Sequence, residues 1–261
     1  MIIKKYELLN ESLKALSKST IKLLILQGEQ GCGKTYTTLK YLQENKLNYH
    51  YINNYATPLS FYQLLYENRK RDVIVFDDIQ GIKDPKICSI LKAACWESEG
   101  NKRVINYHST SPILEKNELP SSFELEANII LIFNDKLNGF EPIIDRGFLI
   151  RFSFSFKEKL RIFDLFKDQA NISSEVLDYI KINCNEATQN LSIRSLVNLS
   201  KMQKDGFDFK IFAKEMLIQD EEIEDLITMS STEWCSNTGK HRATYFRKKK
   251  KYKISKEERY F

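Results

Sequence analysis

The sequence predicts an α/β protein: a parallel five-stranded sheet with flanking helices, followed by a small helical domain. Two patterns indicate this. Short apolar runs alternate with amphipathic stretches up to about residue 154, and residues 155–217 then show helical periodicity throughout. Nine glycines and five prolines, with no low-complexity tract, exclude collagen-like and disordered classes. The five predicted strands are residues 21–26, 47–52, 73–76, 128–133 and 148–154.

The longest apolar runs are only about as long as a strand, so no membrane-spanning segment is expected. The N-terminal residues lack the long apolar core of a signal peptide. Five cysteines at irregular spacing match neither a disulfide framework nor a zinc site. These features predict a cytoplasmic protein that has no membrane partner.

The first apolar run leads into the pattern G-x-x-x-x-G-K-[ST], followed by a predicted helix from Tyr36 to Leu42. Glycines let backbone N–H groups surround a phosphate, and the helix N-terminus adds positive potential. Lys34 would place its charge on the β- and γ-phosphates, and the Thr35 hydroxyl would be a Mg²⁺ ligand. The alternative is a glycine turn that happens to precede a lysine. The predicted ATP-binding residues are Gly28, Glu29, Gln30, Gly31, Cys32, Gly33, Lys34, Thr35 and Tyr36.

The third apolar run ends in two adjacent carboxylates, Asp77 and Asp78. An acid at the carboxyl end of a buried parallel strand lies beside the phosphate loop. We expect Asp77 to hold the Mg²⁺ shell and Asp78 to orient or deprotonate the attacking water. The alternative is a solvated strand-to-loop turn, where acids are common.

From about residue 20 to residue 217, the chain resembles AAA+ ATPases of the P-loop class. The resemblance implies that Asn134, after the fourth predicted strand, is the polar sensor of the catalytic site. It also implies that Arg146 is an arginine finger reaching a neighbouring subunit, and that Arg194 senses the γ-phosphate from a lid. The alternatives are a turn asparagine, a surface arginine and a solvent-facing helical arginine.

One position departs from most AAA+ ATPases, which carry glutamate where this chain has Asp78. The Asp-Asp form is similar to that of the bacterial replication initiator and related helicase loaders. Because the shorter side chain would hold water less well, we expect slow ATP hydrolysis, stimulated by DNA or by oligomerisation.

The helical domain is predicted from residue 155 to 218 and contains four helices. Ser155 and Glu158 form a capping box that opens the first one. The other three are expected near residues 173–184, 191–203 and 208–217. By the resemblance, this domain is the lid of the nucleotide site.

The positive charge is concentrated at the C-terminal end. Residues 239–261 contain ten Lys or Arg and two acids, so the other 238 residues carry a net charge of −3 although the whole chain carries +5. Such asymmetry is typical of a segment that meets a polyanion. A second basic pair, Lys102 and Arg103, would lie either in a DNA-contacting loop or in a solvated turn.

Residues 231–252 resemble the second and third helices of a helix-turn-helix, with Gly239 ending the first of them. Residues 221–228 could supply the preceding helix, and Ala243 and Phe246 would face inward. A solvated basic tail, a membrane-surface segment and a nuclear-targeting signal are the alternatives. The predicted DNA contacts are Lys240, His241, Arg242, Thr244, Tyr245, Arg247, Lys248, Lys249, Lys250 and Lys251.

The sequence thus predicts an ATPase domain (1–154), a lid (155–218) and a DNA-binding segment (219–261). The leading hypothesis is an ATPase that forms a ring or filament on DNA as a replication loader or accessory protein, with a helicase, polymerase or recombinase as partner. One alternative is an ATP-gated DNA-binding regulator or transposition-type switch with weak hydrolysis, and another is a protein-remodelling ATPase. An amino-acid composition rich in Lys, Asn and Ile would suit a phage or mobile element.

Overall fold

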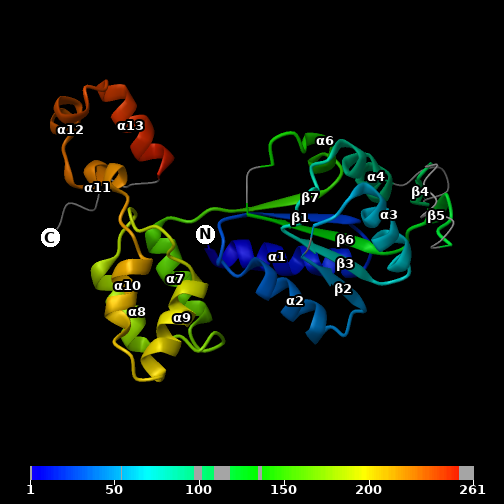
Figure 1. Cartoon of the computed structure of the whole chain (residues 1–261), viewed down its shortest axis with the longest axis horizontal. Coiled ribbons are helices and arrows are strands. Elements are labelled where there is room, and N and C mark those ends of the chain that lie inside the picture. The colour runs from blue at the N-terminus through cyan, green and yellow to red at the C-terminus, as the bar shows by residue number, and fades with distance from the viewer. Residues whose placement is uncertain (1, 54, 97–101, 109–117, 135–136, 253–261) are drawn as a thin grey trace. The chain divides into compact units, whose positions relative to one another are not determined.

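The computed structural model describes residues 2–53, 55–96, 102–108, 118–134 and 137–252, with the side chains of residues 2 and 3 excepted. The chain divides into two compact units, one formed by residues 3–152 and the other beginning at Ser153 (Figure 1). No helix in the described ranges combines the length and the apolar character needed to cross a membrane.

The first unit contains a parallel five-stranded sheet in the order β2-β3-β6-β1-β7. All five predicted strands are present, so the predicted α/β sheet is confirmed. All six residues of β6 are buried, as expected for a central strand that helices cover on both faces. The strands are β1 (Leu23–Gly28), β2 (Tyr49–Ile52), β3 (Val73–Asp77), β6 (Asn128–Phe133) and β7 (Phe148–Phe152).

Helices cover both faces of this sheet. Figure 1 shows α1 and α2 on one face, and α3, α4 and α6 on the other. Phe61 of α3 and Leu91 of α4 belong to one apolar core with Ile25 of β1 and Ile129 of β6. The helices are α1 (Ile2–Ser17), α2 (Lys34–Glu44), α3 (Pro58–Glu67), α4 (Pro85–Cys95) and α6 (Glu141–Ile144).

Helix α1 was not predicted, although its buried residues carry a helical signal. Tyr6, Leu9, Leu13 and Leu16 are all buried, at intervals of three and four residues. The buried Asn128 side chain donates from Nδ2 to the Leu16 carbonyl at 2.8 Å. The end of α1 is therefore bonded to the start of the central strand.

A second unpredicted element is the antiparallel pair β4 (Val104–Asn106) and β5 (Ser122–Glu124), inserted between α4 and β6. Arg103, just before β4, is 3% exposed and donates to the carbonyls of Ala94 and Glu126 at 3.1 and 2.6 Å. Both interpretations of Arg103 from the sequence are therefore wrong, because its guanidinium joins the end of α4 to the segment just before β6. Residues 97–101 of the expected loop lie outside the described residues.

The second unit begins with the four predicted helices. Ser155 and Glu158 form the expected capping box at the first, with each side chain bonded to the other residue's backbone N–H. Apolar residues such as Phe163, Leu177 and Leu199 make the core of this part. The helices are α7 (Phe156–Phe166), α8 (Ser174–Asn183), α9 (Ile193–Lys204) and α10 (Phe209–Met216).

Three short helices follow: α11 (Glu221–Thr228), α12 (Ser231–Thr238) and α13 (Arg242–Lys251). Their core consists of the buried side chains Leu226, Trp234 and Tyr245, one from each helix. Gly239 ends α12 with φ 67°, the left-handed conformation expected of a glycine terminator. A small core thus holds the basic helix α13 against its two neighbours.

Candidate nucleotide site and basic segment

The strand register brings the predicted catalytic residues to one edge of the sheet. Gln27 of β1 pairs with Phe133 of β6, and Asp77 of β3 pairs with Ile132 of β6. The residues that follow these strands lie at their shared carboxyl ends. The Gly28 loop, Asp78 and Asn134 therefore meet there, as expected for a doubly wound sheet.

Two backbone conditions require glycines in this loop. Gly31 and Gly33 have φ of 66° and 81°, the left-handed region that residues with a Cβ avoid. Gly28 passes very close to β7, since a Cβ at this position would lie 2.1 Å from the Phe152 carbonyl oxygen. The loop is therefore shaped both by its own turns and by the neighbouring strand.

Lys34, the first residue of α2, is 4% exposed and its ammonium group has three oxygen acceptors. Nζ donates to the carbonyls of Gly28 and Glu29, each at 2.8 Å, and to Oδ1 of Asn134 at 3.2 Å. An ammonium group has three N–H donors. The buried charge is thus matched by oxygen acceptors inside the loop and at the end of β6.

Asn134 links Lys34 to the second carboxylate. Its Oδ1 accepts from Lys34, and its Nδ2 donates to Oδ2 of Asp78 at 3.0 Å. The Asp78 backbone has φ 51°, and its N–H donates to the Ile132 carbonyl at 2.9 Å. Aspartate adopts this left-handed conformation more readily than most residues that carry a Cβ.

The first carboxylate has two hydroxyl donors. Thr35 Oγ1 and the hydroxyl of Tyr51 both donate to Oδ2 of Asp77, each at 2.8 Å. Oxygen atoms are the ligands that Mg²⁺ prefers, so the Thr35 hydroxyl and the Asp77 carboxylate fit the ion that the sequence predicts. Tyr51 was missed by the sequence analysis, because no local motif signals a tyrosine on a neighbouring strand.

Tyr6 was also missed. This buried residue of α1 donates its hydroxyl hydrogen to the carbonyl of Cys32 inside the loop. Its ring lies 5.7 Å from that of Phe152 on β7. Burial raises the pKa of the Cys32 thiol, and Sγ lies 3.1 Å from the Glu29 carbonyl. Helix α1 thus supports the loop, and Cys32 contributes a buried, protonated side chain to it.

Glu29, Gln30 and Tyr36 are exposed at the same loop and the first turn of α2. Tyr36 is 45% exposed. These three predicted nucleotide contacts therefore present accessible side chains around the buried Lys34.

Arg146 lies at the end of the sheet where the strands begin, opposite the phosphate loop. It precedes β7, and Phe148 of β7 pairs with Leu24 near the start of β1. Its Nη1 donates to the Pro142 carbonyl at 2.6 Å, and its guanidinium lies 5.9 Å from the centre of the Trp96 ring. Both side chains line a hollow of about 570 Å³. A six-residue strand is roughly 20 Å long, so Arg146 is remote from the nucleotide loop of its own chain.

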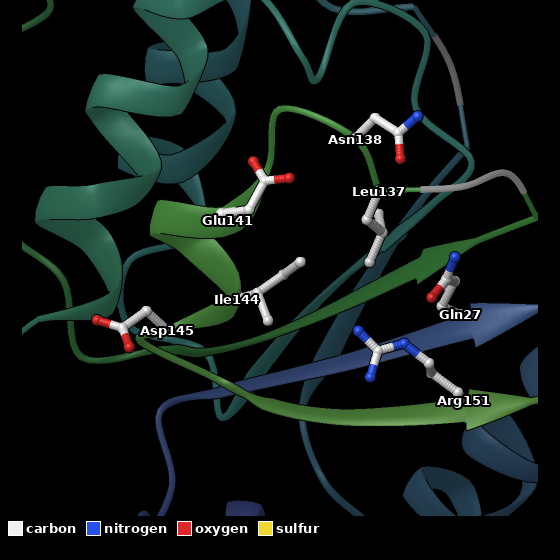
Figure 2. Close-up of a pocket in the computed structure, with 7 residues that line it drawn as sticks. All are labelled: Gln27, Leu137, Asn138, Glu141, Ile144, Asp145 and Arg151. Carbon is white, nitrogen blue, oxygen red and sulfur yellow. The ribbon is translucent and has the colours of Figure 1, made fainter.

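A second hollow, of about 450 Å³, lies over the ends of β1 and β7 beside α6 (Figure 2). Gln27 and Arg151 extend over the strands, and Glu141 and Asp145 come from α6 and its end. The lining mixes one cation with two carboxylates, which is unlike a phosphate cradle.

Arg194, predicted to sense the γ-phosphate, belongs to the second unit. It is exposed in the first turn of α9. Ser192 caps this helix by accepting from the Ser195 N–H at 3.2 Å. Arg194 is thus carried at a well-defined helix start, and its role stays a prediction.

In the basic segment, one predicted DNA contact is wrong and so are two predicted core residues. Tyr245 is 3% exposed, its ring lies 5.6 Å from that of Trp234, and its hydroxyl donates to the Met229 carbonyl at 2.9 Å. Ala243 is exposed, and Phe246 is 45% exposed. The helical phase of α13 is therefore shifted from the expected one, because Trp234 packs against Tyr245.

The other predicted DNA contacts differ in their exposure and in the groups that they contact. Lys240 and Lys248 both contact the Glu222 carboxylate of α11. The hydrogen bond from Lys248 holds the pKa of Glu222 below its usual value. Lys249 lies 5.0 Å from the centre of the Tyr245 ring, and Thr244 is half-buried. Lys240 is exposed although it contacts Glu222, and the other exposed members are His241, Arg242, Arg247, Lys250 and Lys251.

Comparisons with known proteins support the fold. No protein-family model matches the chain. An uncharacterized 36.7 kDa protein of the nrdC-mobD intergenic region of Enterobacteria phage T4 is 29% identical over 153 residues, which are 56% of this chain and 45% of the phage protein. This chain thus matches less than half the length of that relative.

Two solved structures are similar over most of the chain. The Thermotoga maritima RuvB Holliday junction branch migration motor has a TM-score of 0.53 at 13% identity, covering 93% of this chain and 82% of RuvB. A mutant of the same RuvB has a TM-score of 0.54 at 14% identity, covering 92% and 82%. At such identities the likeness concerns the fold alone. The chain therefore shares the fold of these structures, a parallel five-stranded sheet flanked by helices.

Proposed function

We propose that this protein binds and hydrolyses ATP, assembles with copies of itself and acts on DNA, as a loader or accessory ATPase in replication. The observation that carries the proposal is the hydrogen-bonded series Lys34–Asn134–Asp78, which lies beside Asp77 at the edge where the loop meets the sheet. The resemblance of its motifs to AAA+ ATPases, together with the likeness of its fold to the RuvB motor, supports the same function.

The residues of the loop suit a triphosphate. The first N–H groups of α2 have no acceptor within the helix, so they are available to phosphate oxygens. A phosphate oxygen would replace one of the three acceptors of Lys34, giving a shorter, charge-assisted bond. Thr35 and Asp77 would hold Mg²⁺, which when bound neutralises charge on the β- and γ-phosphates.

Hydrolysis would depend on Asp78. Its carboxylate, held by Asn134 Nδ2, would orient the attacking water and accept its proton. Because aspartate is shorter than glutamate, we expect slow turnover that rises on assembly or on DNA. Arg146, at the end of the sheet opposite the phosphate loop, would contact the nucleotide of a neighbouring copy. Arg194 would contact the chain's own nucleotide from the lid.

DNA binding would reside in α13. Its exposed cations, which include Arg242, Arg247 and Lys250, would contact phosphates and give salt-dependent affinity. The short Asp78 also favours a second candidate, an ATP-gated DNA-binding switch in which hydrolysis matters little. In that case ATP binding alone would control assembly.

The test measures ATP turnover and oligomer mass, each with and without single- and double-stranded DNA, for the wild type, Lys34→Ala and Asp78→Ala. We expect ATP to drive assembly of the wild type and of Asp78→Ala but not of Lys34→Ala, and DNA to stimulate turnover in the wild type alone. Assembly of wild type and Asp78→Ala without stimulation would favour the switch. Absence of ATP binding by the wild type would overturn both candidates.

A further inference from the structure

We propose that Tyr51 is a positioning residue that fixes the Asp77 carboxylate for its role in the metal shell. This inference rests on the proposed nucleotide function and adds a residue to it. Tyr51 and Thr35 donate to the same oxygen, Oδ2, at 2.8 Å each. Neither the sequence motif nor the similarity to other proteins assigns a role to Tyr51.

The geometry explains why a tyrosine is needed. Tyr51 pairs with Val75 in the register of β2 and β3, so it lies two residues before the level of Asp77. Side chains two residues apart on a strand share a face of the sheet. A phenol is long enough to cross this step, and its hydroxyl reaches Oδ2.

Two donors hold the carboxylate better than one. The torsion that rotates an aspartate carboxylate has a broad energy minimum, so its angle is set by contacts. Thr35 bonds Oδ2 from α2, and Tyr51 bonds it from the edge strand β2. Because both hydroxyls use Oδ2, we assign Oδ1 to the metal shell.

The orientation matters because Mg²⁺ requires near-ideal octahedral geometry. Residues that orient the groups around a metal commonly affect its affinity, although they do not touch it. Loss of the Tyr51 hydroxyl should therefore weaken the Mg²⁺-dependent part of nucleotide binding and leave the remainder unchanged.

The chain supplies a matched control in Tyr49, two residues earlier on the same strand and face. The Tyr49 hydroxyl accepts from Gln43 Nε2 of α2 at 3.1 Å. Tyr49→Phe removes a comparable hydroxyl that bridges β2 and α2, and it leaves Asp77 untouched. Any general effect of loosening β2 would appear in both variants.

The experiment measures equilibrium binding of a fluorescent ATP analogue during Mg²⁺ titration, for the full-length wild type, Tyr51→Phe, Tyr49→Phe and Asp77→Asn. For Tyr51→Phe we expect the Mg²⁺ midpoint to rise about two- to tenfold, the range given by one hydrogen bond. Affinity in EDTA should stay unchanged, and Tyr49→Phe should match the wild type. Asp77→Asn should show the largest rise.

An unchanged midpoint in Tyr51→Phe, while Asp77→Asn is shifted, would overturn the role of Tyr51 and leave the proposed function intact. Equal shifts in Tyr51→Phe and Tyr49→Phe would also overturn it, because they would indicate a general role of the strand. Absence of nucleotide binding by the folded wild type would instead overturn the proposed function, and this inference with it.

Discussion

The phosphate-loop end of the sheet holds the cation Lys34, whereas the basic helix α13 carries several cations, and the two regions hold them differently. Lys34 is 4% exposed and bonded to three oxygens from the loop and β6. On α13, Arg242, Arg247 and Lys250 are exposed, and a core of three buried side chains positions the helix. Fixed geometry suits one small polyanion, whereas an exposed row of charge suits an extended polyanion and weakens with salt.

The largest expected effect tests whether the small core alone positions α13. Trp234→Ala removes a fully buried side chain, at a cost of about 3–5 kcal/mol. We expect α11–α13 to lose protection from hydrogen exchange, while the sheet and the nucleotide affinity stay intact. Phe246→Ala, at a 45% exposed position of α13, is the control and should change little. Loss of protection in the sheet as well would show that the two regions are not independent.

The next effect tests the fixed charge at the phosphate-loop end of the sheet. Lys34→Ala should weaken binding of Mg²⁺–ATP by about 10- to 100-fold, as expected for loss of a hydrogen bond to a charged group. Lys40→Ala on the same helix is the control, because Lys40 is partly exposed and lies 3.9 Å from Glu44. Calorimetry measures the affinity of both variants for Mg²⁺–ATP. Equal losses in the two would mean that the position of the charge is unimportant.

A smaller effect separates the core role of Tyr245 from its predicted DNA contact. Tyr245→Phe keeps the ring against Trp234 and removes the hydrogen bond to the Met229 carbonyl. We expect a loss of about 1 kcal/mol in the stability of α11–α13 and no change in the salt dependence of DNA binding. A reduced salt slope at unchanged stability would restore Tyr245 as a DNA contact.

The smallest effect concerns the acid that restrains two of the lysines. Glu222→Gln releases Lys240 and Lys248, so the salt slope of DNA binding at neutral pH should steepen by about one to two units. Glu221→Gln on the same helix is the control, since it changes the net charge equally. Anisotropy of labelled duplex DNA in increasing KCl measures the slopes. Equal slopes in both variants would mean that only net charge counts.

The ion pair between Glu222 and Lys248 also makes the stability of the protein depend on pH. Because the pKa of Glu222 is lowered in the folded protein, its contribution to stability is present above the ordinary glutamate pKa and is lost as pH falls through the lowered one. Exposed pairs contribute little, so this change is small. Near neutral pH the pair is intact, and the two lysines stay restrained.

Sequence patterns predicted the elements that carry a local signal. The five strands, the capping box at Ser155 and the left-handed Gly239 follow from periodicity and from short motifs, and all are present. The β4–β5 pair was missed because three-residue strands have no measurable period. The inward face of α13 was also missed, since Tyr245 and Phe246 are adjacent aromatic residues and composition alone does not select which of them faces the core.

By itself, the sequence determined that a glycine-rich loop follows one buried strand, that carboxylates end another, and that the cations gather at one end of the chain. Only the tertiary structure decided which groups meet: Asn134 with Lys34 and Asp78, and Tyr51 with Asp77. Local spacing sets the conformation of each element. Contacts between strands far apart in the chain depend instead on register and side-chain length, which only the assembled sheet specifies.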